Sequence, residues 1–193
     1  MSRRIIILTW VSASWKTSIQ NELMNRWWKR PINFSTRKPR SDNAYAVDWD
    51  LDFNSDELNE YVFIDRNTFS IKMINWDFVE ITQYWGNFYG VSETFLQDGS
   101  PLKKENICVI LDPIGRSQLM ERLTREGVPF ETYYIYISQE LQEDRLTKRW
   151  DKQEEIIKRR KDFNWFHPTN NCVRINGDLP INEIADFIIN RNV

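Results

Sequence analysis

Short apolar runs alternate with amphipathic segments along most of the chain. Residues 4–9 (RIIILT) and 107–111 (ICVIL) are nearly continuous apolar runs, which is the pattern of strands buried on both faces of a sheet. Residues 78–84 alternate between apolar and polar positions, as a half-buried strand does. The same criteria predict a strand end running into a loop at 33–40 and short strands at 61–64, 132–137 and 172–176.

Segments with apolar residues three and four positions apart predict helices between these strands. The expected helices cover residues 16–26, 66–74, 92–97, 116–126 and 180–191, and residues 139–163 are expected to form a charged stretch of two helices. Pro31 is expected to end the first helix and Gly127 the fourth, because proline cannot continue a helix and glycine favours its end. The stretch WGNFYG at 85–90 is expected to be a turn.

The alternation of strands and helices predicts an α/β protein with a parallel sheet covered by helices on both faces. A polar block at about 31–92 interrupts this alternation, which indicates a small subdomain inserted into the sheet protein. Within that block, residues 41–61 contain seven acidic residues and no Lys or Arg, so this segment is expected to be a solvated insertion. The length of 193 residues fits a single domain.

Composition and charge argue against several classes of function. The net charge of −2 gives no general attraction to nucleic acid or to an acidic membrane. No stretch approaches the roughly 18 apolar residues that a membrane span needs. The start of the chain is similar to a signal peptide, but its apolar run is short and a buried first strand is the better interpretation. Cys108 and Cys172 are too few for a disulfide scaffold, so both are expected to be reduced and buried, as in a cytoplasmic protein.

The segment TWVSASWKTS at 9–18 has the order of a phosphate-binding loop, with a strand before it and a helix after it. Such a loop, G-x-x-x-x-G-K-[ST], binds phosphate through backbone N–H groups at a helix N-terminus, and its hydroxyl helps to hold Mg²⁺. Lys16 and Thr17 stand at the Lys and hydroxyl positions. Trp10 and Trp15 stand where the pattern has glycine, which allows positive φ and close approach to phosphate. Alone, the segment is a weak match, and an ordinary strand-to-helix turn explains it equally well.

Six further segments, in chain order, resemble the motifs of the guanylate kinase family. These are FSTRKPR at 34–40, YVF at 61–63 followed by Phe69, FVE at 78–80 followed by GNFYG at 86–90, ILD at 110–112, RLTKR at 145–149 followed by EEIIKRR at 154–160, and INGD at 175–178. Each match is weak by itself. Their common order over about residues 5–190 makes the resemblance specific.

The resemblance implies a P-loop kinase fold of three parts. A parallel-sheet core at 1–30, 93–138 and 163–193, flanked by helices, would carry an inserted nucleoside monophosphate (NMP)-binding subdomain at about 31–92 and a helical lid at about 139–162. The implied reaction is ATP + GMP (or dGMP) giving ADP + GDP (or dGDP), by in-line phosphoryl transfer with Mg²⁺ as the cofactor of ATP. The implied partners are these nucleotides, with no nucleic acid and no membrane, in the cytoplasm. Monomer and homodimer both remain open.

The resemblance also implies roles for individual residues. Those for ATP and the phosphate loop are Trp10, Val11, Ser12, Ala13, Ser14, Trp15, Lys16, Thr17, Ser18 and Asn176. Those for GMP are Ser35, Arg37, Arg40, Tyr61, Glu80, Tyr89, Ser92 and Asp112. Those for catalysis are Lys16, Arg37, Arg145, Arg149 and Arg160, and those for Mg²⁺ are Thr17 and Asp112.

The chemistry of these side chains fits the implied roles. Arg37 and Arg40 are suited to bidentate binding of a phosphate dianion. Glu80 is a carboxylate that can accept two N–H bonds from the Watson–Crick edge of guanine, which adenine cannot offer. Arginines of the lid would neutralise charge on the transferring phosphoryl group. Each of these side chains also has an interpretation without a function. The arginines could be solvated surface charges, and Glu80 could form an ion pair at the surface.

Two departures from the family pattern affect the GMP site. Val91 stands where the family usually has Ser or Thr, so one contact to guanine is either missing or made by Ser92. The loop between Arg40 and Tyr61 is longer than usual, so Tyr45 competes for the role given to Tyr61.

Four tryptophans stand where the resemblance expects glycine: Trp10, Trp15, Trp76 and Trp150. The chain has 9 Trp and only 6 Gly, although globular proteins usually contain about 7% Gly. One interpretation is that a gene in which UGA encodes glycine has been translated with UGA as tryptophan. The alternative takes the tryptophans literally, so that the chain is a guanylate-kinase-like binding module without catalysis. A kinase for another phosphorylated acceptor is a third alternative, against which Glu80 argues.

Overall fold

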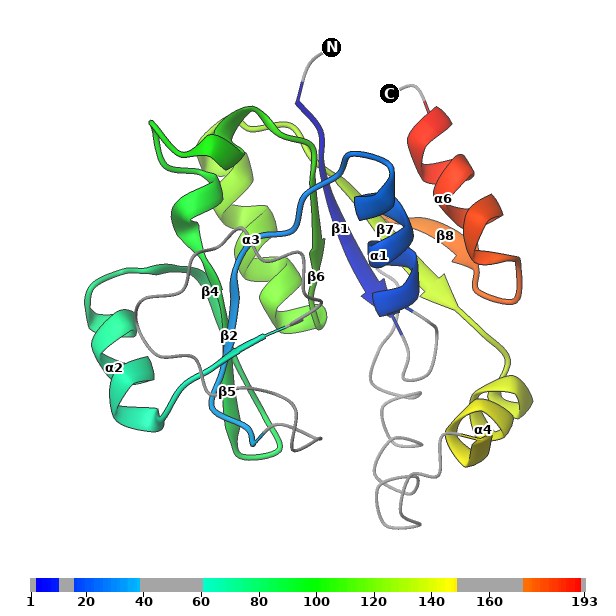
Figure 1. The fold of residues 1–193 in the computed structure, drawn as a ribbon, viewed down its shortest axis with the longest axis horizontal. Coiled ribbons are helices and arrows are strands. Elements are labelled where there is room, and N and C mark those ends of the chain that lie inside the picture. Colours follow the sequence, from blue (N-terminus) through cyan, green and yellow to red (C-terminus); the bar gives the residue numbers. More distant parts are fainter. Residues whose placement is uncertain (1–2, 11–15, 39–60, 149–171, 192–193) are drawn as a thin grey trace.

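The main sheet of the protein has four parallel strands in the order β6-β1-β7-β8 (Figure 1). The computed structural model describes residues 3–10, 16–38, 61–148 and 172–191. The strands of the main sheet are β1 (Ile5–Trp10), β6 (Ile107–Ile110), β7 (Glu131–Tyr136) and β8 (Val173–Asn176). Because all four are parallel, their carboxyl ends lie at the same edge of the sheet.

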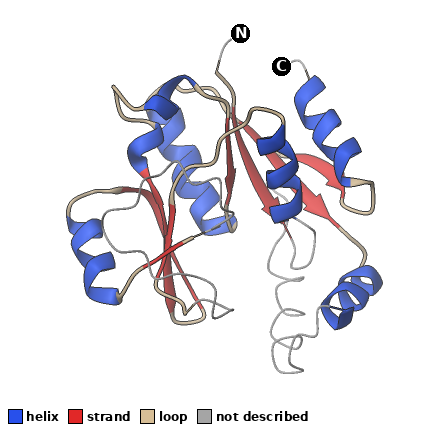
Figure 2. Ribbon diagram, viewed as in Figure 1, coloured by secondary structure: helices blue, strands red, loops and turns tan. Residues whose placement is uncertain are grey.

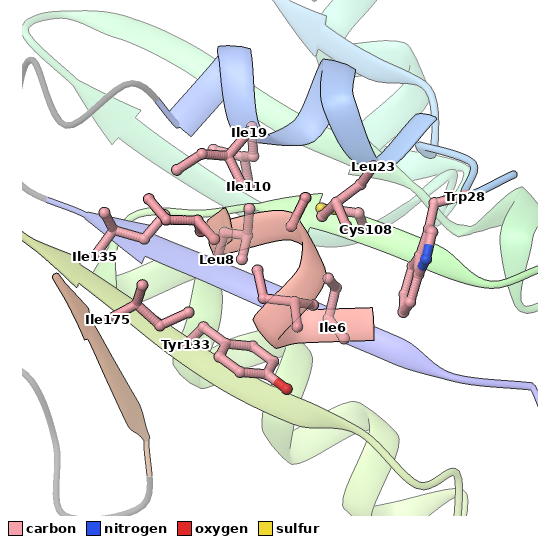
Figure 3. Packing of buried hydrophobic residues seen from close by; sticks show 13 residues of the cluster. Ile6, Leu8, Ile19, Leu23, Trp28, Cys108, Ile110, Tyr133, Ile135 and Ile175 are labelled. Carbon is pink, nitrogen blue, oxygen red and sulfur yellow. The ribbon is translucent and has the colours of Figure 1, made fainter. Parts of the chain in front are cut away.

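Helices cover both faces of this sheet (Figure 2). The helices that follow its strands are α1 (Lys16–Asn25), α3 (Pro113–Arg125), α4 (Gln139–Lys148) and α6 (Ile181–Asn190). Alternate side chains of β1 point to opposite faces. Ile6 and Leu8 join a buried cluster with α1 and α6 (Figure 3), whereas Ile5 and Ile7 join a second cluster with α3.

A second, mostly antiparallel sheet has the order β3-β2-β5-β4. Its strands are β2 (Asn33–Ser35), β3 (Val62–Phe63), β4 (Phe78–Tyr84) and β5 (Asn87–Ser92), and α2 (Arg66–Ile74) packs against it. Phe69 is the buried residue of α2, and its ring stacks on Phe78 at 4.7 Å and on Phe88 at 5.6 Å between ring centres. This aromatic cluster holds α2 on the second sheet.

Helix α3 joins the two sheets. Leu119 of α3 packs in the buried cluster that also contains Ile7 of β1 and Val79 of β4. The side-chain amide of Gln118 donates to the carbonyl oxygen of Ile81 and accepts from the N–H of Ile81, both at 2.9 Å. The helix therefore contacts β4 through both its apolar and its polar side chains.

The structure confirms the α/β fold with a parallel sheet between helices and most of the expected elements. The helix expected at 66–74 and the strand expected at 78–84 have those bounds. Pro31 is wrong as the end of the first helix, because α1 ends at Asn25. The chain leaves that helix through a left-handed residue, Trp27, whose φ is 73°.

Two expectations for the region after β4 are wrong. Residues 87–92 form β5 and not part of a turn, because the reversal of the chain needs only Trp85 and Gly86, both with positive φ. Two such residues form the tight turn whose twist suits a hairpin. The helix expected near 92–97 is a 3-10 helix of one turn, Glu93–Phe95.

Helix α3 also begins earlier than the expected residue 116. Asp112 caps it and Pro113 occupies its first position, where proline is favourable because no helical N–H bond is lost. The lid expected at 139–162 is described only as far as α4, and the acidic insertion at 41–60 lies outside the described residues.

Cys108 is fully buried, whereas Cys172, also expected to be buried, is only partly so, and among the described residues neither forms a disulfide bond. In the part of the chain that the structure describes, no helix has the length and apolar character needed to cross a membrane.

Replacing Phe69 by alanine is expected to lower the free energy of unfolding by about 3–5 kcal/mol, because it removes a buried ring and leaves a cavity. Ile71→Ala is the matched control on the same helix: its side chain is 58% exposed, and its loss should change the stability by no more than about 0.5 kcal/mol. Urea unfolding followed by circular dichroism measures both variants. Equal losses would contradict the role given to Phe69.

Candidate functional site

The beginnings of α1 and α3 lie at the carboxyl edge of the main sheet, where ligands bind in parallel α/β sheets. Lys16 opens α1 after β1, and Asp112 caps α3 after β6, the parallel neighbour of β1. Trp10 is the last residue of β1 and pairs in register with Ile135. The loop at 11–15 lies outside the described residues. Lys16 and Asp112 thus belong to the same edge of the sheet.

The side chain of Glu80 on β4 is buried, with an exposed fraction of 4%. A register shift between Phe78 and Glu80 places Glu80 opposite Val91 of β5, whose N–H donates a hydrogen bond to the carboxylate. The Oε2 atom of Glu80 has no hydrogen-bond partner among the described residues. A buried oxygen without a donor is unfavourable, so this position suits a ligand that brings N–H groups.

The surroundings of Glu80 change its acidity. Burial, and next to it the negative charge of Asp112, raise the pKa of Glu80 to about 8, although the bond from the Val91 N–H acts in the opposite direction. The side chain therefore holds a proton over most of the neutral range when no ligand is bound.

Glu80 fits against α3 because residue 115 is a glycine. A Cβ atom at position 115 would lie 2.4 Å from Oε2 of Glu80 and 3.2 Å from Cγ2 of Thr82. The Oδ1 atom of Asp112 accepts a hydrogen bond from the N–H of Gly115 at 2.8 Å and so holds this turn of the helix. We call Glu80, Asp112 and Gly115 the acidic cluster.

A second group of predicted residues gathers around Arg37, in the loop after β2. The guanidinium carbon of Arg37 lies 4.8 Å from the ring centre of Phe63 and 5.3 Å from that of Tyr61. Tyr61 makes an edge contact with Tyr89 at 5.8 Å between ring centres. The hydroxyl of buried Ser35 accepts a hydrogen bond from the backbone N–H of Arg37 at 3.2 Å, and Ser35 pairs with Tyr89 across the sheet. The second sheet thus brings four of the predicted GMP residues together.

Arg145 connects α4 to the turn after β8. Its Nη2 atom donates a hydrogen bond to the carbonyl oxygen of Gly177 at 3.1 Å. Burial lowers the pKa of Arg145, against the opposing effect of the Asp178 and Asp144 charges. In the same turn, Oδ1 of Asn176 accepts a hydrogen bond from the N–H of Asp178 at 3.0 Å. A predicted lid arginine and a predicted ATP residue therefore meet at this turn.

The remaining predicted residues have other surroundings or lie outside the described ranges. Ser92 caps the 3-10 helix at Glu93–Phe95, where its hydroxyl oxygen accepts a hydrogen bond from the N–H of Thr94 at 3.3 Å. Thr17 and Ser18 are partly buried in the first turn of α1. The residues outside the described ranges are Val11, Ser12, Ala13, Ser14, Trp15, Arg40, Arg149 and Arg160.

Two residues near this site, Gly115 and Arg116, were not predicted from the sequence. Glycine is unfavourable inside a helix, so a glycine soon after the Asp-Pro start of a helix indicates a close approach of another group. That signal was present at 112–115. Arg116 is only 2% exposed, and its Nε and Nη1 atoms have no hydrogen-bond partner among the described residues. On an amphipathic helix, no local pattern separates such an arginine from an exposed one.

Within the described ranges, no group of three or more His, Cys, Asp or Glu side chains is placed to hold a metal ion.

Known proteins similar to this chain were found by sequence and by structure, although no family model matches it. A guanylate kinase of Myxococcus xanthus is 26% identical over 161 residues, which cover 81% of this chain and 68% of the relative. A guanylate kinase of Alkalilimnicola ehrlichii is 26% identical over 162 residues, which cover 83% of this chain and 72% of the relative. The crystal structure of guanylate kinase from Anaplasma phagocytophilum matches with a TM-score of 0.65 and 19% identity, covering 98% of this chain and 84% of that one. In sequence and in fold, the chain is therefore similar to guanylate kinases over most of its length.

The structural match also confirms the P-loop α/β kinase fold that the sequence motifs predict. The part of this fold that the structure describes includes the parallel main sheet with helices on both faces.

The stability of the protein is expected to fall as the pH rises from about 5 to 8, because of Glu80. The folded protein keeps a proton on Glu80 up to a pKa of about 8, whereas the ordinary value is 4.5, so the folded state binds more protons in this interval. One pKa unit corresponds to about 1.4 kcal/mol, so the loss is on the order of a few kcal/mol.

Urea unfolding at both pH values measures this loss, with Glu80→Gln as the matched control. Glutamine has no titrating proton, so the variant should lack this part of the pH dependence. The same pH dependence in both proteins would contradict the protonated state of Glu80.

Proposed function

We propose that the protein transfers a phosphoryl group from ATP to GMP or dGMP. The observation that carries this proposal is the buried carboxyl group of Glu80, whose Oε2 has no partner among the described residues. Guanine presents two adjacent N–H donors on its Watson–Crick edge, and one carboxylate accepts both. Adenine presents a ring acceptor at the corresponding position, which would face the lone pairs of a carboxylate.

The phosphate of the acceptor fits the group around Arg37. A guanidinium binds a phosphate dianion through two parallel hydrogen bonds. The rings of Tyr61 and Phe63 position this guanidinium by cation–π contact. Tyr61 and Tyr89 supply hydroxyl donors, and Arg40 is proposed as a second guanidinium on the same phosphate.

ATP is proposed to bind at the carboxyl edge of the main sheet, with its phosphates at residues 10–15 and Lys16. The N-terminus of α1 favours an anion, and Lys16 neutralises charge on the phosphates. A phosphate oxygen of the acceptor attacks the γ-phosphorus of ATP. The bond from this phosphorus to the bridging oxygen then breaks, and ADP leaves with the electron pair. Arg145, Arg149 and Arg160 stabilise the charge on the transferring group.

Mg²⁺ is the proposed cofactor, and the chemistry of the residues at the carboxyl edge fits it. Mg²⁺ requires oxygen ligands and is usually held through one or two protein oxygens together with the nucleotide phosphates. Thr17 and Asp112 would supply a hydroxyl and a carboxylate, from segments that follow the neighbouring strands β1 and β6. When bound, the ion offsets negative charge on the phosphates. The position of Asp112 beside Glu80 also supports a contact to the guanine amino group.

The proposed partners are therefore nucleotides and not nucleic acid or membrane, in keeping with the net charge of −2. A cytoplasmic location is proposed because a chain with only two cysteines has no disulfide scaffold.

A second candidate function is nucleotide binding without turnover. Tryptophan at positions 10 and 15 favours it, because a large side chain would fill the space in which a phosphate loop binds its ligand.

An ADP-release assay with ATP, Mg²⁺ and a panel of nucleoside monophosphates tests the proposal. GMP or dGMP is expected to give the highest kcat/KM, with little turnover of AMP, CMP or UMP. The chain should be assayed beside a Trp10→Gly/Trp15→Gly version. A higher kcat/KM with another acceptor would show that GMP is not the preferred substrate. GMP binding without turnover in both versions would establish the binding function.

Gly115→Ala is expected to raise the KM for GMP by roughly tenfold or more, because hydrogen bonds to charged groups contribute about 1.5–3 kcal/mol and the carboxylate would be displaced. The new Cβ would lie 2.4 Å from Oε2 of Glu80. The KM for ATP should be unchanged. Ser117→Ala, at an exposed position of the same helix, is the matched control in steady-state kinetics. A larger effect on ATP than on GMP would show that Gly115 does not serve the acceptor site.

A further inference from the structure

Helix α3 ends in a hydrogen-bonding pattern known as the Schellman motif. The N–H of Val128 donates to the carbonyl oxygen of Leu123 at 2.9 Å, and the N–H of Gly127 donates to that of Thr124 at 3.1 Å. Gly127 has a φ of 65°. The position after the helix cap in this motif is left-handed, and glycine is the usual residue there because it has no Cβ to clash.

Helix α1 ends in the same motif. The N–H of Trp28 donates to the carbonyl oxygen of Leu23 at 3.1 Å, and the N–H of Trp27 donates to that of Met24 at 3.2 Å. Trp27 stands at the glycine position and has a φ of 73°.

Helix α2 repeats the motif a third time. The N–H of Asp77 donates to the carbonyl oxygen of Lys72 at 3.0 Å, and the N–H of Trp76 donates to that of Met73 at 3.2 Å. Trp76 has a φ of 60°. Two of the three motifs therefore have tryptophan where the third has glycine.

Among the residues that the structure describes, no packing contact of Trp27 or Trp76 offsets this strained backbone. Their side chains are 85% and 80% exposed, so neither ring gains stability by burial. The neighbouring Trp28 is different: it is 3% exposed, lies in the main buried cluster (Figure 3) and has the guanidinium of Arg4 over its ring at 5.5 Å. A tryptophan required by the fold thus stands directly beside one that the fold disfavours.

We infer that positions 27 and 76 are glycine in the natural protein, and that its gene encodes them by UGA codons read as glycine. Among the described residues, three residues other than glycine have positive φ, and all three are tryptophans. Random substitution would not select the largest side chain for left-handed positions. Reading UGA as tryptophan produces this substitution wherever glycine had been encoded by UGA.

The third left-handed tryptophan, Trp85, has a φ of 47°. Because its ring stacks on Tyr84 at 4.6 Å between ring centres, its packing does not distinguish tryptophan from glycine as it does at positions 27 and 76. The same decoding would explain Trp10, Trp15 and Trp150, where the family resemblance expects glycine. The ends of α1 and α2 require glycine at positions 27 and 76 whether or not the protein has catalytic activity.

The codons of the source gene and the mass of the natural protein test the inference directly. UGA is expected at positions 27 and 76 and UGG at position 28. Peptides from protein isolated from its own source should carry glycine at 27 and 76 and tryptophan at 28. UGG codons at 27 and 76, or tryptophan in those peptides, would overturn the inference.

A stability series tests the backbone argument on the recombinant chain. Trp27→Gly and Trp76→Gly should each raise the folding equilibrium constant by roughly tenfold, since a left-handed non-glycine residue costs about 1–2 kcal/mol. Gly127→Trp should lower it by a similar factor, and Trp28→Gly should lower it more strongly because it empties a buried site. Unchanged or reduced stability in both Trp→Gly variants would contradict the assignment of these positions to glycine.

Discussion

The close approach of the first turn of α3 to β4 is the contact on which both the fold and the site depend. A side chain at position 115 would displace the carboxylate of Glu80, because Oε2 of Glu80 occupies the space of a Cβ. One turn further along, Gln118 continues the contact through two hydrogen bonds to the backbone of Ile81. The same helix packs on β1 through its apolar face. Helix α3 therefore connects the two sheets and also packs against Glu80 in the acidic cluster.

Patterns within short stretches of sequence predict the helices and strands that local interactions determine, but not the contacts between distant segments. The periodicity of residues 66–74 and 78–84 was sufficient for α2 and β4, since each element has its own buried positions. Strand β5 was missed because a two-residue turn separates it from β4, and tryptophan at position 85 conceals the usual sign of such a turn. Family resemblance pointed to Glu80, but its burial against Gly115 is a contact between distant segments that no window of sequence contains.

The ends of the helices show a different reason for a failed prediction. The rules for ending a helix predicted Gly127 correctly, and α1 and α2 obey the same physics with another residue at the same point. The backbone conformation at a position is determined by all the surrounding contacts. A positive φ therefore indicates that the position suits glycine. At the ends of α1 and α2, the structure therefore corrects the identity of the residue as well as the predicted end of the helix.

Burial of Glu80 also determines the protonation state of this side chain before a ligand binds. With its pKa raised to about 8, the side chain is neutral at rest, so the free protein avoids the large energetic cost of an isolated buried charge. A ligand with two suitably placed N–H groups stabilises the carboxylate and so lowers its pKa, and the proton is released to solvent. A ligand without them meets only a neutral carboxyl group. Discrimination between bases would then depend on the ionisation of Glu80 during binding, and not on a carboxylate that is already charged in the free protein.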